Sequence, residues 1–303
     1  MSYLLDLAVR LAVAASRWPE DFRRPHTEYL LAAQRDDGGF AGRQGASDLY
    51  YTSFALRGLA LLGALDEPVA TRAGRFLRSR FEGELPGVDL YSLIFSVSLL
   101  DTACAANILT GDQWTTMAAA VDRHRHPSGG YAKSSNNPAG STYHTFLAVS
   151  CGQLLGTARP PSESLAEWIV SRRRDDGGFV EIPQMRASGT NPTAAAVVLL
   201  SELGALDEQT REGAARLLAS MQNEEGGFRA NTQIPIADLL STFTALAALG
   251  ELNASALIDG QAAAEYAKRL QRPDGGFRGG TWDNAVDVEY TFYGLGTLAL
   301  AGS

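Results

Sequence analysis

The sequence is poor in cysteine, in histidine and in clustered positive charge. Its 303 residues include two cysteines and four histidines, and acidic residues outnumber basic ones, which leaves a net charge of −8 at pH 7. Binding to nucleic acid relies on clustered lysine and arginine, so this composition argues against nucleic acid as a partner. Cys104 and Cys151 stand in apolar segments, which predicts small buried residues and no disulfide framework.

Long hydrophobic runs are also missing. No stretch of about 18 apolar residues occurs, so we expect no transmembrane segment. Residues 3–17 are largely apolar but carry Asp6 and Arg10 four positions apart, which indicates an amphipathic helix and a poor signal peptide. The expected compartment is therefore the cytoplasm.

Glycine, in contrast, is plentiful, and much of it recurs in one short phrase. The phrase is Asp-Asp-Gly-Gly-Phe at its first occurrence, residues 36–40. Its copies, from strong to degenerate, occupy residues 175–179, 224–228, 273–277, 127–131 and 82–87. The last three strong copies follow one another at intervals of 49 residues, so we infer six units of about 45 to 50 residues, a period typical of repeat architectures.

Each unit reads as an outer helix, a glycine turn, an irregular loop and an inner helix. In the first unit Gly38 and Gly39 end the outer helix, because glycine tolerates the positive φ found there, and Asp48 is a good N-cap for the inner helix. Outer helices, charged on one face, are predicted at 26–34, 67–80, 112–125, 162–173, 208–222 and 260–271. Inner helices, apolar nearly all round, are predicted at 49–62, 89–108, 141–156, 191–204, 238–251 and 287–301.

Six inner and six outer helices in strict alternation predict an all-α fold, a single α6/α6 barrel or toroid. Residues 1–303 form one domain, in which 1–25 are an N-terminal helix and lead-in and 26–303 are the six repeats. We expect helix 3–17 to pack over the seam where the ring closes, and the long loops 131–140 and 179–190 to form a rim. An open superhelical array is the alternative, but the inner helices are too apolar to line an open groove.

The repeat resembles a known one. Residues 34–40, 222–228 and 271–277, with the inner-helix starts at 48–52, 143–145 and 287–291, are similar to the repeat of protein prenyltransferase β subunits and squalene-hopene-type triterpene cyclases. The resemblance covers the chain from residue 26. It implies an α6/α6 barrel around an apolar central cavity that holds an isoprenoid chain. It also implies a helical-repeat α-type subunit as a possible partner.

The catalytic sets that the resemblance implies are incomplete in this chain. In the prenyltransferases one zinc ion is held by an aspartate, a cysteine two residues later and a histidine; here Asp238 matches, but Leu240 and Tyr290 stand at the other two positions. Zinc is therefore not supported by the matched positions. The Asp-x-Asp-Asp acid of the cyclases is also missing, and we expect its nearest counterpart, Asp101, to be a helix-end residue.

Aligning the inner-helix starts places four carboxylates at one opening of the barrel. Asp48, Asp89, Asp238 and Asp287 share one position, where each is predicted to be an N-cap. In a closed barrel these carboxylates encircle the opening, and such a ring could hold a divalent cation such as magnesium. His144 stands three residues after the same position; it is either a hydrogen-bonded structural residue or a proton carrier, because imidazole titrates near neutrality.

Aromatic residues gather at the same starts. Their faces suit an isoprenoid chain or a carbocation, and they also suit packing between inner helices. The candidate substrate-binding residues are Tyr51, Tyr91, Tyr143 and Phe292. The candidate catalytic residues are His144, Asp238, Asp287, Tyr290 and Asp48.

These observations favour a divergent prenyltransferase-type enzyme that binds an isoprenoid diphosphate in a central apolar cavity. One alternative is an isoprenoid or terpene cyclase with an unusual acid, taken from Asp48, Asp238, Asp287 or His144. Another is a nonenzymatic barrel that carries a lipid or another apolar small molecule, or that binds a protein.

Overall fold

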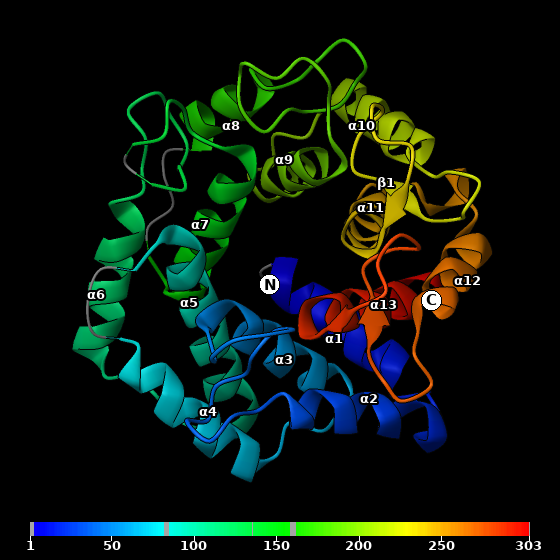
Figure 1. Cartoon of the computed structure of the whole chain (residues 1–303). Helices are drawn as coiled ribbons and strands as arrows, with labels where there is room; N and C mark the ends of the chain where they lie inside the picture. The colour runs from blue at the N-terminus through cyan, green and yellow to red at the C-terminus, as the bar shows by residue number, and fades with distance from the viewer. Residues whose placement is uncertain (1–2, 82–84, 135, 158–161, 303) are drawn as a thin grey trace.

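Alternating segments of the chain form two concentric rings of helices, as Figure 1 shows. The computed structural model describes residues 3–81, 85–134, 136–157 and 162–302, and among these it contains thirteen α-helices. The inner ring consists of α3 (Leu49–Leu61), α5 (Gly87–Cys104), α7 (Thr142–Leu154), α9 (Thr190–Glu202), α11 (Leu239–Glu251) and α13 (Val288–Ala301). The outer ring consists of α2 (Glu20–Ala32), α4 (Glu67–Ser79), α6 (Gly111–Asp122), α8 (Ser162–Val170), α10 (Glu208–Ser220) and α12 (Gly260–Leu270).

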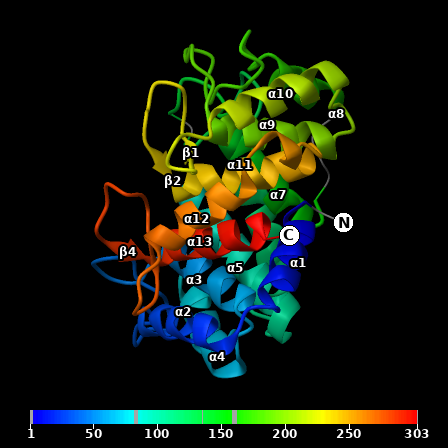
Figure 2. The ribbon, with the colours of Figure 1, turned by 90° about the vertical axis from the view of Figure 1, so that its right-hand side faces the viewer.

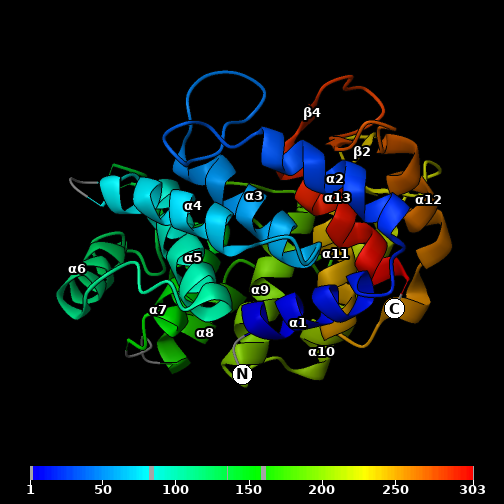
Figure 3. The same ribbon diagram turned by 90° about the horizontal axis from the view of Figure 1, so that it is seen from below.

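The predicted all-α toroid is therefore confirmed. The segments between outer and inner helices add two short antiparallel pairs, β1 (Phe228–Arg229) with β2 (Ala237–Asp238) and β3 (Phe277–Arg278) with β4 (Val286–Asp287). These strands and their loops lie at one end of the ring, here called the mouth, and the N-terminal helix α1 (Tyr3–Ala15) lies at the opposite end (Figures 2 and 3). The weakest repeat copy, at residues 82–87, falls partly on 82–84, which lie outside the described residues.

A threonine near the start of the inner helix joins the glycine turn to that helix. The backbone N–H of Phe228, at the end of its turn, donates to Oγ1 of Thr242 at 2.9 Å, and that hydroxyl donates to the carbonyl of the N-cap Asp238 at 2.6 Å. The same pair of bonds recurs with threonines 52, 145 and 291. The phenylalanines at these turns have no exposed surface. Each of these turns is therefore held by hydrogen bonds and by a ring buried in the core.

Three of the predicted aspartate caps are present, and one prediction was wrong. Asp48, Asp238 and Asp287 each accept a hydrogen bond from the backbone N–H three residues later. Asp89 is instead the third residue of α5, and the helix follows Pro86, which makes no side-chain cap. The extended conformation of Pro86 starts this helix three residues earlier than in the other units, which moves Asp89 into its first turn.

The ring closes through the same contact that joins neighbouring units. Gly38 adopts φ +91°, and a Cβ there would collide with the backbone of Arg72 in α4, the next outer helix. Gly275 adopts φ +98° and lies in the same way against the backbone of Pro25 in α2. Because Gly275 belongs to the last unit and Pro25 to the first, this contact joins the two ends of the repeat. The helix α2 begins at Glu20, six residues before its predicted start, and so includes Pro25.

Two further interactions hold the seam. His26 is fully buried; its Nδ1 accepts a hydrogen bond from the backbone N–H of Gly276 at 3.0 Å, and its ring stacks on Phe277 with centroids 4.9 Å apart. On the mouth side, Arg43 of the first unit forms ion pairs with Asp283 and Asp287 of the last.

The helix α1 packs on α13 and α3, the two inner helices at the seam, as expected. It also reaches across this end of the ring, because the backbone N–H of Tyr3 donates to Oε1 of Glu202 in α9 at 2.8 Å. Among the described helices, α5 alone has the length and hydropathy that a membrane span requires, but half of it is buried in the ring. Its place in the inner ring is that of a core helix.

We expect the stability of the ring to depend on pH through His26. Burial lowers the pKa of His26 to about 4 from its ordinary value of 6.5. The unfolded chain therefore binds a proton that the folded chain does not, and the free energy of unfolding should fall as the pH is lowered from about 6.5 towards 4. Asparagine retains an acceptor at the same place, so His26→Asn should remove up to about 3 kcal/mol of this decrease. Urea denaturation of both proteins between pH 4 and 7.5 measures the slope, and parallel curves would contradict the prediction.

Candidate functional site

The inner helices direct one row of side chains towards the axis of the ring. On α3 this row is Tyr50, Phe54 and Arg57, at the spacing of one helical face. Phe54 contacts Phe292 and Tyr293 of α13 with ring centroids 5.8 and 5.2 Å apart. The residues that line this interior, here called the lumen residues, are Tyr50, Phe54, Arg57, Tyr143, Phe243, Glu289, Phe292 and Tyr293.

The lumen is a hollow. Tyr143 lies deep within the molecule with protein on all sides, yet 36% of its surface remains accessible. Arg57 is likewise enclosed and only partly covered. A side chain surrounded by protein but still accessible lines an internal space. Tyr50, Arg57, Tyr143 and Glu289 keep accessible surface, and the buried rings of Phe54, Phe243, Phe292 and Tyr293 pack around them. A space with so many aromatic rings suits an apolar ligand with double bonds.

Two ionisable side chains interrupt this aromatic wall. The guanidinium of Arg57 lies over the ring of Phe54 at 4.2 Å and over that of Phe292 at 4.7 Å, and its Nε donates to the backbone carbonyl of Ser53 at 3.2 Å. Burial lowers the pKa of Arg57.

Glu289 is the second of these groups. It is the second residue of α13, and its Oε1 accepts a hydrogen bond from the hydroxyl of Tyr50 at 2.7 Å. Burial raises the pKa of Glu289 to about 7, Asp287 adds to the increase, and the Tyr50 hydrogen bond and Arg57 oppose it. The side chain is therefore protonated in a large fraction of molecules at neutral pH.

Neither Arg57 nor Glu289 was predicted from the sequence. A signal was present, because each is a charged residue within an inner helix that is otherwise almost entirely apolar. Charge in such a helix must face the lumen or a partner, since burial of an unpaired charge is costly.

The three aspartates predicted to be catalytic lie at the mouth, each bonded to backbone. Asp238 accepts from the backbone N–H of Ser241 at 2.7 Å and from its hydroxyl at 2.9 Å, so both carboxylate oxygens have a donor. Asp287 accepts from the N–H of Tyr290 at 2.8 Å and from Nε of Arg43 at 2.9 Å. Burial raises the pKa of Asp48, Asp238 and Asp287. Their catalytic role stays a prediction.

The residues at the zinc positions do not fit a zinc ion. Leu240 offers no donor atom, and Tyr290 packs its ring against Gly279 of its own loop, with Arg43 at 5.9 Å from the ring centroid. Across the described ranges, no three His, Cys, Asp or Glu side chains are grouped so that they could hold a metal ion. The aspartates that the sequence placed around the mouth as a possible magnesium site therefore do not form such a group.

His144 is part of a hydrogen-bonded cluster near the mouth. Its Nδ1 lies 2.9 Å from Oγ of Ser141, and that hydroxyl also donates to the carboxylate of Glu181, a rim residue that the sequence did not single out. Burial, with Lys133 and His124 nearby, lowers the pKa of His144 to about 4. The imidazole is therefore neutral near pH 7, and Nε2 is buried with no hydrogen-bond partner among the residues that the structure describes.

The four predicted substrate-binding aromatics divide into two pairs. Tyr143 and Phe292 are lumen residues. Tyr51 packs against Gly42 of its own rim loop, and Tyr91 is almost fully buried between the rings of His124 and His144, at 6.1 and 6.4 Å. Their roles towards a ligand remain predictions.

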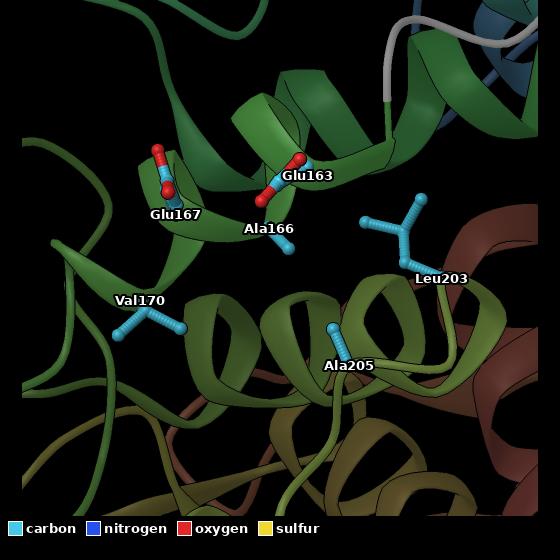
Figure 4. Close-up of a pocket in the computed structure, with 6 residues that line it drawn as sticks. All are labelled: Glu163, Ala166, Glu167, Val170, Leu203 and Ala205. Atoms are coloured by element: carbon cyan, nitrogen blue, oxygen red, sulfur yellow. The ribbon is translucent and has the colours of Figure 1, made fainter.

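A surface depression of about 310 Å³ lies outside the ring, between α8 and the turn that leads from α9 to α10 (Figure 4). It is lined by Glu163, Ala166, Glu167, Val170, Leu203 and Ala205. Its apolar side chains face one another, and the two glutamates stand on α8 above them. With no nucleophile, histidine or hydroxyl group in its wall, it has no chemistry comparable to that of the lumen.

Known proteins share this architecture. A model of the prenyltransferase alpha-alpha toroid domain matches residues 21–77 and 193–303. Protein geranylgeranyltransferase-I of Candida albicans, solved with GGPP, superposes with a TM-score of 0.70 at 16% identity, over 92% of this chain and 90% of that one. The type II terpene cyclase MstE of Scytonema, solved as a variant with geranylgeranyl dihydroxybenzoate, superposes with a TM-score of 0.65 at 16% identity, over 98% and 99%.

A protein from Actinoplanes superposes with a TM-score of 0.64 at 18% identity, over 93% of this chain and 98% of that one. No curated protein sequence matches the chain. At these identities the solved structures establish the fold alone. Because the domain model covers more than half of the sequence and the ring of helices agrees with it, the chain belongs to the prenyltransferase alpha-alpha toroid domain family.

Proposed function

We propose that this chain is an enzyme that holds an isoprenoid chain in the lumen and converts it by proton transfer from Glu289, as an isoprenoid cyclase with an unusual acid. The observation that carries the proposal is a partly buried carboxyl group, held by the Tyr50 hydroxyl, among aromatic rings. Both solved relatives named with isoprenoid ligands share the toroid fold, which supports the same class of ligand here.

The chemistry balances without a further reactant. The proton on Oε2 of Glu289 passes to a double-bond carbon, the π electrons form the new C–H bond, and a tertiary carbocation remains at the neighbouring carbon. The next double bond closes a ring onto this cation. Loss of a C–H proton to the Glu289 carboxylate restores the acid. The ring faces of Tyr50 and Tyr143, which keep accessible surface in the lumen, stabilise the positive charge during these steps.

The prenyltransferase-type transferase favoured by the sequence remains the second candidate. Its support is the fold of geranylgeranyltransferase-I, and its zinc donor set does not fit this chain. An α-type helical-repeat partner and a cytoplasmic location are retained as proposals on the same family resemblance, with the two free cysteines in keeping with a reducing compartment. Native mass spectrometry of the purified chain tests for an obligate partner.

The replacement Glu289→Gln should separate binding from conversion. Glutamine keeps the size of the side chain and an acceptor for Tyr50 but has no acidic proton. We expect the binding of geranylgeraniol, followed by intrinsic fluorescence, to change by less than about threefold, and product formation, followed by gas chromatography with mass spectrometry, to fall by about 100-fold or more.

Glu163→Gln on the exposed outer helix α8 is the matched control and should behave as the wild type. A wild-type protein that binds C15 and C20 isoprenoids but converts none would support the lipid carrier instead. A protein that binds none would overturn the proposal, and unchanged turnover in Glu289→Gln would exclude Glu289 as the acid.

Conversion should decrease as the pH rises above about 7. The protonated form of Glu289 is the active one, and its pKa of about 7 sets the midpoint. The neighbouring groups that shift the pKa of Glu289 are Tyr50, Asp287, Arg57 and Arg43. Because the Tyr50 hydrogen bond lowers this pKa, Tyr50→Phe should move the alkaline limb of the pH profile to higher pH. A limb that stays in place or moves to lower pH would contradict the assignment.

A further inference from the structure

Arg57 has hydrogen-bond donors that the chain does not use. Its guanidinium lies near the rings of Phe54 and Phe292, and Nε is bonded to the carbonyl of Ser53. Its two terminal amino groups, Nη1 and Nη2, make no hydrogen bond or ion pair within the part of the chain that the structure describes, nor are they among the fully covered polar atoms. They are therefore open to the lumen.

The position of these donors follows from the helix. Arg57 lies seven residues after Tyr50 on the same face of α3, about 10 Å further from the mouth. Helical side chains lean towards the N-terminus, so the guanidinium is directed back towards the mouth, at the level of Phe54 and Phe292. It therefore faces the middle of the lumen.

The charge of Arg57 has no permanent counter-charge nearby. Its electrostatic neighbours are Tyr293 of α13, Tyr143 of α7, Tyr50 of its own helix, and Glu289. The three hydroxyl groups are neutral at pH 7, and Glu289 is partly protonated and forms no ion pair with Arg57. A partly buried cation without a counter-charge is costly unless a ligand supplies the anion.

We propose that Arg57 binds the carboxylate of an isoprenoid acid, whose head group lies inside the lumen and whose chain lies against the aromatic wall. This inference rests on the proposed function and names its substrate class. The two terminal amino groups present a parallel pair of N–H donors that matches the two oxygens of a carboxylate.

Charge matching favours a carboxylate over a diphosphate. Arg43 is the other cation that lowers the pKa of Glu289. It is already paired with Asp283 and Asp287 at the rim. One unpaired guanidinium therefore balances one negative charge, whereas a diphosphate carries two or three and needs several donors.

The test compares three ligands of equal chain length: farnesoic acid, farnesol and farnesyl diphosphate. Isothermal titration calorimetry of the wild type should show the acid binding at least about tenfold more tightly than the alcohol. Arg57→Gln should abolish this preference and leave the affinity for farnesol within about threefold, and Arg57→Lys should restore part of it. Arg269→Gln, which alters an exposed arginine stacked on Tyr266 of α12, is the matched control and should preserve the preference.

Each outcome separates this inference from the proposed function. Equal binding of acid and alcohol by the wild type would overturn the carboxylate site and leave the isoprenoid lumen intact. Tighter, Arg57-dependent binding of the diphosphate would overturn the choice of carboxylate. Failure of all three ligands to bind would overturn the proposed function itself. If Arg57→Gln unfolds, as judged by circular dichroism, the preference of the wild type for the acid over the alcohol and the binding measured with Arg57→Lys still test the proposal.

Binding should also be linked to proton uptake. A carboxylate beside Arg57 cancels the charge that lowers the pKa of Glu289, so Glu289 should take up a proton when the acid binds near pH 7.5. Titrations in buffers of different ionisation enthalpy measure this uptake. We expect it for farnesoic acid with the wild type and not for farnesol or for Glu289→Gln. Identical uptake with acid and alcohol would contradict a carboxylate at Arg57.

Discussion

The structure depends on a threonine hydroxyl, found in at least four units, that accepts a hydrogen bond from the glycine turn and donates one to the N-cap carbonyl of the inner helix. In the fifth unit Thr242 accepts from the N–H of Phe228 and donates to the carbonyl of Asp238, and matching pairs occur in at least three other units. These bonds are buried, so losing one leaves unsatisfied backbone groups at the helix start. Because they set the angle between turn and inner helix, they also set where the next outer helix packs.

A ring built in this way repeats the same turn and helix start in most units, with α5 as an exception, so its chemistry must come from side chains that break the repeat. Asp48, Asp238 and Asp287 keep the repeat, as caps. Arg57 and Glu289 break it, each as a charged group within a nearly apolar inner helix. Ionisable groups retained in such a setting are candidates for function, since structure alone gains nothing from their desolvation.

Local rules predicted the helices well and two helix starts badly. Caps and glycine turns act over a few residues, so the order of elements could be inferred without any knowledge of packing. Asp89 failed because Pro86 changes the start of α5, and α2 begins at Glu20 and includes Pro25, which a helix pattern would normally exclude. The candidate site was predicted only in part: Tyr143 and Phe292 face the lumen, while Tyr51 packs under its own rim loop.

The sequence by itself determined the number and order of the helices, because the glycine phrase and the apolar periodicity are local signals repeated along the chain. It also predicted that the zinc ligands are incomplete, because this depends on residue identity at matched positions. Only the tertiary structure decided which groups meet. Ring closure places Glu289 of the last unit beside Tyr50 of the first, 239 positions away, and lays Phe292 beside Arg57. The raised pKa of Glu289 and the open donors of Arg57 arise from this enclosure, since desolvation depends on what surrounds a side chain in space.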